Sequence, residues 1–183
     1  MYDYMCTYSG QMLKPLELRP EDIDPLDIAH ALSLLCRGSG HLVHFYSVGQ
    51  HCINCAKEAK ARGWDRRVVL GCLVHDASEA YLSDIIRPVK KHLSNYMELE
   101  DRILLTVYQR FGIGDLTEEE YGKIRRIDNE ILENEIPVLM SRPGDTQPAK
   151  LFSEPDFSQR DMKAVEEEYL RMVKELMESQ EVI

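Results

Sequence analysis

An unbroken apolar run at residues 68–74 constrains the fold of this chain more than any other stretch. The run reads Val-Val-Leu-Gly-Cys-Leu-Val and follows Asp65, a residue type that commonly caps the start of a helix. A helix that is apolar on nearly every side lies in the middle of a protein rather than on its surface. Because the run ends at His75-Asp76, we expect a central helix to deliver an imidazole and a carboxylate from the core into a site.

Amphipathic patterns on both sides of this run predict further helices and no convincing strand. The predicted helices cover about residues 25–36, 47–62, 94–111, 117–140 and 158–179. Residues 1–22 look irregular, whereas residues 141–157 contain three prolines and a glycine and predict a loop that could act as a lid or an oligomer contact. We therefore predict one all-α domain over residues 1–183, a compact helical bundle with its core at about 24–140 and a C-terminal helix at about 158–179.

The overall composition excludes several classes of protein. With 183 residues, 44% of them hydrophobic and 30% charged, the chain can bury a core without disulfides, as soluble globular proteins do. No apolar run approaches the roughly 20 residues that a membrane helix needs, and the start lacks the features of a signal peptide. We therefore expect a cytoplasmic protein with no membrane partner. The net charge of −10 argues against a nucleic-acid partner, but not against a small phosphorylated substrate.

The five cysteines predict reduced thiols rather than a disulfide framework. Cys52 and Cys55 have C-x-x-C spacing, but they lie within an apolar helical pattern and no second pair accompanies them, which favours core packing. A thiol-based metal or redox sensor built on this pair is the non-enzyme alternative. It predicts that Cys→Ser substitutions abolish metal binding while His75→Ala does not.

Two imidazoles and two carboxylates on different helical segments form a candidate metal set. The set consists of His51, His75, Asp76 and Asp128. Such ligands suit one divalent ion, and Mn, Co, Mg, Fe and Zn are all chemically possible. Glu79 follows about one helical turn after Asp76, within reach of a water on such an ion.

Structural alternatives remain open for each of these residues. His51 is also compatible with an ordinary core or surface histidine, and His75-Asp76 with a helix cap. Asp128 adjoins the apolar face of its helix, where an unpaired carboxylate is costly, but Arg125 stands three residues away and could pair with it.

Taken together, these motifs resemble the HD-domain phosphohydrolase superfamily, all-α metalloenzymes that hydrolyse phosphate esters. The order of the four candidate ligands carries this resemblance. The segment 75–79, with Asp84 and Pro88-Val89-Lys90, is similar to the 5′-deoxynucleotidase branch and its phage relatives. Residues 27–32, Arg37, 40–41 and 45–48 resemble small phage and prophage members, which include a dATP triphosphohydrolase. The resemblance covers about residues 24–140.

The resemblance implies a role for each matching residue. One divalent metal ion would be held by His51, His75, Asp76 and Asp128. Glu79 would orient or deprotonate the attacking water, and Asp84 would help to position the water or the sugar. Arg37 would grip the phosphate that is attacked, and Lys90 would add positive charge near it.

Recognition of the base and sugar departs from the family pattern. In relatives an aromatic residue commonly follows the arginine and packs on the nucleoside, but here that position is Gly38. We therefore expect the substrate contacts near Gly38 to differ, with Tyr81, Tyr46 or Phe45 as candidates for the stacking surface.

The resemblance predicts an enzyme that hydrolyses deoxynucleoside 5′-phosphates, in which water attacks the α-phosphorus and a nucleoside is released. One such site could serve mono-, di- and triphosphates, and dATP or dAMP is the expected substrate. The alternatives are an HD-type cyclic-nucleotide phosphodiesterase and a catalytically silent nucleotide-binding protein. Because small HD nucleotidases are often oligomers, we also expect a homo-oligomer.

Overall fold

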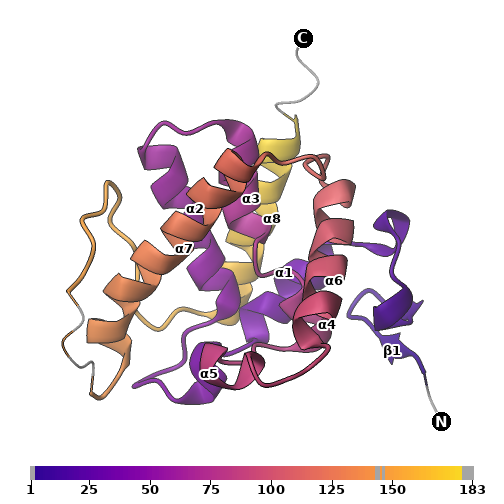
Figure 1. Cartoon of the computed structure of the whole chain (residues 1–183), viewed down its shortest axis with the longest axis horizontal. Helices are drawn as coiled ribbons and strands as arrows, with labels where there is room; N and C mark the ends of the chain where they lie inside the picture. The colour runs from indigo at the N-terminus through magenta and orange to yellow at the C-terminus, as the bar shows by residue number, and fades with distance from the viewer. Residues whose placement is uncertain (1–2, 143–144, 146, 179–183) are drawn as a thin grey trace.

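The computed structural model is all-α, as the sequence predicts, and describes residues 3–142, 145 and 147–178 (Figure 1). Its longer helices are α1 (Pro25–Leu34), α2 (Val48–Ala61), α3 (Arg66–Val74), α6 (Tyr96–Arg110), α7 (Glu118–Leu139) and α8 (Met162–Glu178). Two single-turn helices, α4 (Glu79–Leu82) and α5 (Arg87–Lys90), connect α3 with α6. Short 3-10 turns span Pro15–Glu17, Pro20–Asp22 and Arg37–Gly40. Within the described residues, no helix has both the length and the apolar character that crossing a membrane requires.

The N-terminal segment departs from the prediction, because it contains strands. Strands β1 (Met5–Cys6) and β2 (Met12–Leu13) pair antiparallel. The backbone N–H and the hydroxyl of Ser9 donate to the carboxylate of Asp27 at 2.6 and 2.8 Å, which fastens the hairpin to α1. A ladder of two residues per strand is too short to leave an alternating pattern in the sequence. The predictions for residues 1–2, 143–144, 146 and 179 lie outside the described residues.

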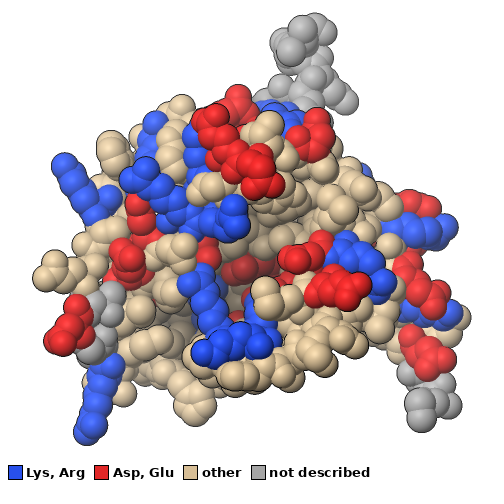
Figure 2. Space-filling model, in the orientation of Figure 1, with Lys and Arg blue, Asp and Glu red and all other residues tan. Residues whose placement is uncertain are grey.

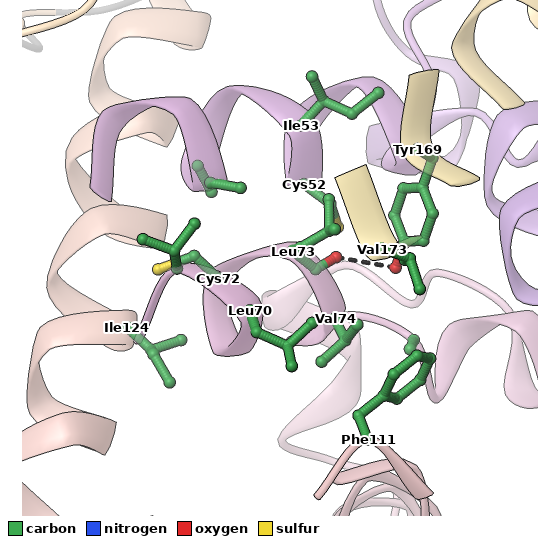
Figure 3. Packing of buried hydrophobic residues seen from close by; sticks show 14 of the residues in the cluster. Cys52, Ile53, Leu70, Cys72, Leu73, Val74, Phe111, Ile124, Tyr169 and Val173 are labelled. Carbon is green, nitrogen blue, oxygen red and sulfur yellow. Dashed lines mark hydrogen bonds between the residues drawn. The ribbon is translucent and has the colours of Figure 1, made fainter. Parts of the chain in front are cut away.

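Helix α3 occupies the middle of the fold, as its apolar sequence predicts. It contacts α2, α6, α7 and α8, and its residues 68–74 are all buried. Figure 3 shows Leu73 among side chains of the surrounding helices, including Ile53 of α2 and Tyr169 of α8. The Tyr169 hydroxyl donates to the Leu73 carbonyl at 2.8 Å, which satisfies a backbone acceptor close to the end of the helix. The chain leaves the core directly after this point, at His75-Asp76.

The described part of the segment between α7 and α8 returns along α2. The side chain of Gln50 donates to the carbonyls of Asp156 and Ser158, at 2.9 and 3.0 Å. Asn54 adds a bond of 2.9 Å to the carbonyl of Asp156. These bonds fix residues 156–158 against the protein's own helix α2.

The close approach of α1 to α2 depends on Gly49. A Cβ atom at this position would lie 3.2 Å from the carbonyl carbon and oxygen of Leu32 and 3.3 Å from the nitrogen of Ser33. Because backbone atoms cannot rotate away as a side chain can, one helix must shift. We expect Gly49→Ala to lower the free energy of unfolding by about 1–3 kcal/mol, measured by urea denaturation.

The matched control is Gly122→Ala, on the exposed side of α7, where an added Cβ meets nothing within 4 Å. This substitution should raise the free energy of unfolding by about 0.5–1 kcal/mol through helix propensity alone. Equal effects of the two substitutions would contradict the packing argument.

Candidate metal centre

Helices α2, α3 and α7 bring the four predicted ligands together. The Nε2 atom of His51 lies 3.2 Å from Oδ1 of Asp128 and 3.9 Å from Oδ2 of Asp76. The Nε2 atom of His75 lies 3.3 Å from the same Asp76 oxygen and 3.8 Å from the same Asp128 oxygen. Two imidazole nitrogens and two carboxylate oxygens therefore face one another, although their helices are far apart in the sequence.

His75 provides the clearest indication that a cation belongs between these groups. Its Nδ1 donates to the carbonyl of Cys72 at 2.8 Å, so Nε2 carries the lone pair of the neutral ring. Nε2 is buried and makes no hydrogen bond. Burial disfavours the charged imidazole, but Asp76, Cys52 and Asp128 together outweigh it and raise the pKa of His75 well above its usual value. The surroundings thus favour positive charge at this point, which a proton or a metal ion can supply.

Glu135 of α7 belongs to the same cluster, and sequence reasoning missed it. Its Oε1 accepts from His51 Nδ1 at 2.6 Å and from the hydroxyl of Tyr46 at 2.9 Å. Burial would raise the pKa of Glu135, but the charges of His51 and Arg37 lower it to about 2. A carboxylate that orients an imidazole in this way is typical of metal-binding histidines. Its spacing could have identified it, because Glu135 follows Asp128 by two helical turns and therefore lies on the same face of α7.

Two arginines balance the carboxylates of the centre. Nη1 of Arg37 lies 3.2 Å from Asp76 Oδ2, and its Nε lies 3.4 Å from Glu135 Oε2. Arg87 donates to Asp128 at 2.6 Å. Asp128 therefore pairs with Arg87 rather than with Arg125, the partner considered from sequence. Arg87 was also missed, since only the fold brings α5 against α7.

Three of the four predicted ligands, His75, Asp76 and Asp128, line a cavity of about 800 Å³, a size typical of small-molecule sites. His51 is fully buried and is not among the lining residues. Figure 2 shows this face hollowed, with acidic side chains within the hollow and Lys and Arg side chains along its edge. Five of the predicted catalytic and substrate residues line the cavity, namely Arg37, Gly38, Glu79, Asp84 and Lys90. Its basic lining also includes Arg87, Lys91 and Arg125.

The backbone conformation at Gly38 favours a glycine at this position. Gly38 has φ +60° and the next residue, Ser39, has φ +53°, so the backbone is left-handed where glycine is favoured. The backbone N–H of Gly38 donates to Asp84 Oδ2 at 3.0 Å. Gly38 therefore holds Asp84 in place and has no side chain to offer to a substrate.

Glu79 and Lys90 occupy different environments in the cavity wall. Glu79 is buried, and its Oε2 makes no hydrogen bond. Burial and the neighbouring carboxylates of Asp76 and Asp84 raise the pKa of Glu79 to about 10. Lys90 is half-buried and donates to Glu100 at 2.6 Å.

The structure does not bring Tyr81 to the cavity, contrary to the prediction that it contacts the substrate. Its ring packs against the apolar core, and its hydroxyl is buried without a hydrogen-bond partner. Among the described residues that line the cavity, Tyr46 is present, whereas Tyr81 and Phe45 are not. The spacing of a tyrosine from a ligand motif does not determine which side of a single-turn helix such as α4 it occupies.

Cys52 and Cys55 are buried in the core, as predicted, but they also lie beside the histidines. Two groups of potential ligand atoms have members within 4.8 Å of one another: His51, Cys55 and His75, and Cys52, His75 and Asp76. The protein thus contains buried His, Cys and Asp groups that could hold a metal ion.

Comparisons with known proteins give relatives but no activity. No protein-family model matches the chain. The Escherichia coli K12 protein YfdR is 36% identical over 110 residues, which are 60% of this chain and 59% of YfdR. A Rhodobacter capsulatus protein is 40% identical over 111 residues, 57% of this chain and 56% of the relative. The chain thus matches less than two thirds of either relative's length, and both relatives are described as uncharacterized.

Proposed function

We propose that this chain is a metal-dependent phosphohydrolase that acts on deoxynucleoside 5′-phosphates, with dATP or dAMP as the leading substrates. The observation that carries the proposal is the buried Nε2 of His75, which has no hydrogen bond and faces the carboxylates of Asp76 and Asp128. The resemblance of the motifs to HD-domain phosphohydrolases supports the choice of reaction and substrate class. Five basic side chains line the cavity beside seven acidic ones, so they and a bound cation together would offset the charge of a phosphorylated ligand.

The donor set fits one divalent ion. Neutral imidazole nitrogens and carboxylate oxygens are ligands that Mn, Co, Mg, Fe and Zn accept in differing degrees. The ion would be held by His51, His75, Asp76 and Asp128. When bound, it supplies Lewis-acid polarisation of a phosphoryl oxygen and a lowered pKa for a coordinated water.

The remaining groups act on the substrate and on the attacking water. Arg37 is mostly buried, with 14% of its side chain exposed, and its fork of N–H donors matches two phosphate oxygens. Glu79 accepts a proton from the water that attacks the α-phosphorus, and the nucleoside 5′-oxygen takes up a proton from solvent as its bond to phosphorus breaks. Asp84, held by Gly38, orients the water or the sugar. Lys90 adds positive charge at the phosphate end of the cavity.

A substrate panel tests this proposal. Purified protein loaded with Mn²⁺, Co²⁺ or Mg²⁺ is incubated with dNMPs, dNTPs, rNTPs and cyclic nucleotides, and the products are separated. We expect deoxyadenosine with phosphate from dAMP, or with triphosphate from dATP. Turnover of cyclic nucleotides alone would indicate a phosphodiesterase, and binding without turnover a silent nucleotide-binding protein. Absence of turnover with all three ions would contradict an enzyme.

His75→Ala should remove the response to metal. A ligand present at 100 times its Kd stabilises a folded protein by about 2.7 kcal/mol, so Mn²⁺ should raise the Tm of the wild-type protein. In His75→Ala the shift should disappear, as measured by differential scanning fluorimetry with and without a chelator. The control is His41→Ala, at an exposed histidine outside the cavity lining, which should retain the shift. An equal shift in both variants would place the ion elsewhere.

Glu135→Gln should weaken metal binding without removing a ligand. The amide cannot supply the charge that holds His51 Nδ1–H, so the imidazole becomes less basic and less fixed. Loss of such a partner typically reduces metal affinity by about 10–100-fold. Calorimetric titration with Mn²⁺ measures the change. Tyr46→Phe, which removes one other bond to the same carboxylate, should have the smaller effect.

A further inference from the structure

The candidate metal centre has a second face, on its core side, that is formed by thiols. Cys55 follows His51 by four residues, so both side chains lie on the same face of α2. Cys55 Sγ lies 3.4 Å from His51 Nε2. In the neutral ring, whose Nδ1–H donates to Glu135, Nε2 has a lone pair that can accept the S–H of Cys55. The thiol is fully buried, so the contact occurs inside the protein.

The spacing of these atoms is close to that of ligands around one small ion. Tetrahedral zinc with bonds of about 2.0–2.3 Å places its ligand atoms roughly 3.3–3.8 Å apart. The ligand atoms of His51, Cys55 and His75 already lie within 4.8 Å of one another. The His75 side chain is only 8% exposed, and its Nε2 makes no hydrogen bond. A small contraction of three side chains would complete the site.

We propose that His51, His75 and Cys55 bind a thiophilic divalent ion such as Zn²⁺ or Cd²⁺, with the Cys55 thiolate as a ligand. Harder ions such as Mn²⁺ and Mg²⁺ instead use the oxygen face made by Asp76 and Asp128. Thiolate is a soft ligand that selects zinc-like ions, whereas carboxylate suits Mg²⁺ and Mn²⁺. Binding releases one proton from Cys55 to solvent, and no oxidation or reduction takes place. The inference rests on the metal centre of the proposed function but not on hydrolysis.

The chemistry of the centre explains why the sulfur would respond to the kind of ion that binds. The free thiol lies 3.4 Å from His51 Nε2 as an S–H donor, so it carries a proton before an ion binds. An ion that binds thiolate strongly drives deprotonation, and an ion that prefers oxygen leaves the S–H in place. The two histidines serve in both cases. A pure thiol sensor would not need His75, whereas this site does.

X-ray absorption of wild-type protein loaded with one equivalent of Zn²⁺ tests the inference directly. We expect one sulfur scatterer at about 2.3 Å beside nitrogen scatterers at about 2.0–2.1 Å. Mn²⁺-loaded protein should show nitrogen and oxygen only. Titration with Cd²⁺ should produce a thiolate-to-metal charge-transfer band that saturates at one ion per chain.

Variants assign the sulfur to one residue. Cys55→Ser should remove the band and leave Mn²⁺ affinity unchanged. It should lower Cd²⁺ affinity by at least roughly tenfold, because even the loss of a residue that only orients a ligand costs that much. Cys55→Ala is the second variant if serine is not tolerated in the core, and circular dichroism confirms that each variant is folded. The matched control is Cys72→Ser, which alters another buried cysteine that belongs to neither ligand group. It should keep the band.

Three results would overturn the inference: no sulfur around Zn²⁺ in the wild-type protein, a band that persists in folded Cys55→Ser, or a band lost in Cys52→Ser instead. None of them depends on turnover. Sulfur ligation without hydrolysis would support this site and contradict the proposed function. Hydrolysis with Mn²⁺ but without sulfur ligation would support the proposed function and contradict this site.

Discussion

Glu79→Gln protein is expected to bind Mn²⁺ as the wild-type protein does and to lose about 10²–10⁴-fold in kcat, the usual contribution of a positioned general base. Glu79 lies in the cavity wall three residues after the proposed ligand Asp76, and its Oε2 is buried without a hydrogen-bond partner. Glutamine keeps the shape of the side chain but cannot accept a proton. The expected loss therefore falls on the chemical step rather than on binding of the ion or of the nucleotide.

Two measurements separate an effect on the chemical step from an effect on binding of the ion. Calorimetric titration gives the Mn²⁺ affinity, and initial rates at saturating dAMP or dATP give kcat. Glu98→Gln, on α6 at an exposed position outside the cavity lining, is the matched control and should retain full activity. Unchanged kcat in Glu79→Gln would remove the role assigned to this carboxylate. Loss of Mn²⁺ binding in that variant would make Glu79 a ligand instead.

The raised pKa of Glu79 bears on this role. Burial is its largest cause, and Asp76 and Asp84 add to it. Positive charge beside Asp76 cancels one of these contributions, which brings the pKa of Glu79 down towards the range in which a carboxyl can take up a proton near neutral pH. A cation at the centre would therefore favour the ionised form of Glu79 that its proposed role requires.

The parts of the fold that could be predicted were those with a strong periodic pattern. The apolar run 68–74 predicts a buried α3, and Thr117 with Glu120 predicts the start of α7, where both bonds of the capping box form. The four candidate ligands could be identified because the order of His and Asp in the chain carries information. The two-residue strands β1 and β2 left no pattern.

The parts of the site that could not be predicted depend on contacts between distant segments. Glu135 matters because α7 lies against α2, where its carboxylate meets His51. Arg87 matters because the fold brings α5 against Asp128 of α7. Tyr81 shows the converse: a suitable residue type near a ligand motif lies on the side of α4 that faces the core. Sequence spacing identifies which residues can bind a metal, and packing decides which neighbours orient them.

Outside the site, the largest loss of stability is expected for Glu58→Gln, at about 3–5 kcal/mol in the free energy of unfolding. Glu58 of α2 is fully buried and holds the segment between α7 and α8. Its Oε2 accepts from the backbone N–H of Ser153 at 2.8 Å and from the Ser153 hydroxyl at 2.5 Å. Oε1 accepts from the backbone N–H of Phe152 at 3.0 Å and from Nε of Arg62 at 2.7 Å. An amide would offer one acceptor and turn its own N–H groups towards these donors.

The same bonds give the effect a pH dependence with a defined sign. Burial would raise the pKa of Glu58, but the hydrogen bonds from Ser153, Phe152 and Arg62 outweigh it and lower the pKa below its usual value. A carboxyl group whose pKa is lower in the folded than in the unfolded protein stabilises the fold fully at pH values above its pKa in the unfolded chain, which is about 4.3 for Glu. This stabilisation disappears as the pH falls through the pKa of the group in the folded protein. The difference between wild type and Glu58→Gln should therefore be full at pH 7 and shrink on acidification below about pH 4.3.

Urea denaturation across this pH range measures the difference. Glu154→Gln, an exposed glutamate in the same segment, is the matched control and should change the free energy of unfolding by less than about 0.5 kcal/mol at every pH. Because α2 also carries His51, loosening of this segment in Glu58→Gln should reach the metal centre as a lower Mn²⁺ affinity. A Glu58→Gln protein as stable as Glu154→Gln would show that the segment is held by its apolar contacts and not by the buried carboxylate.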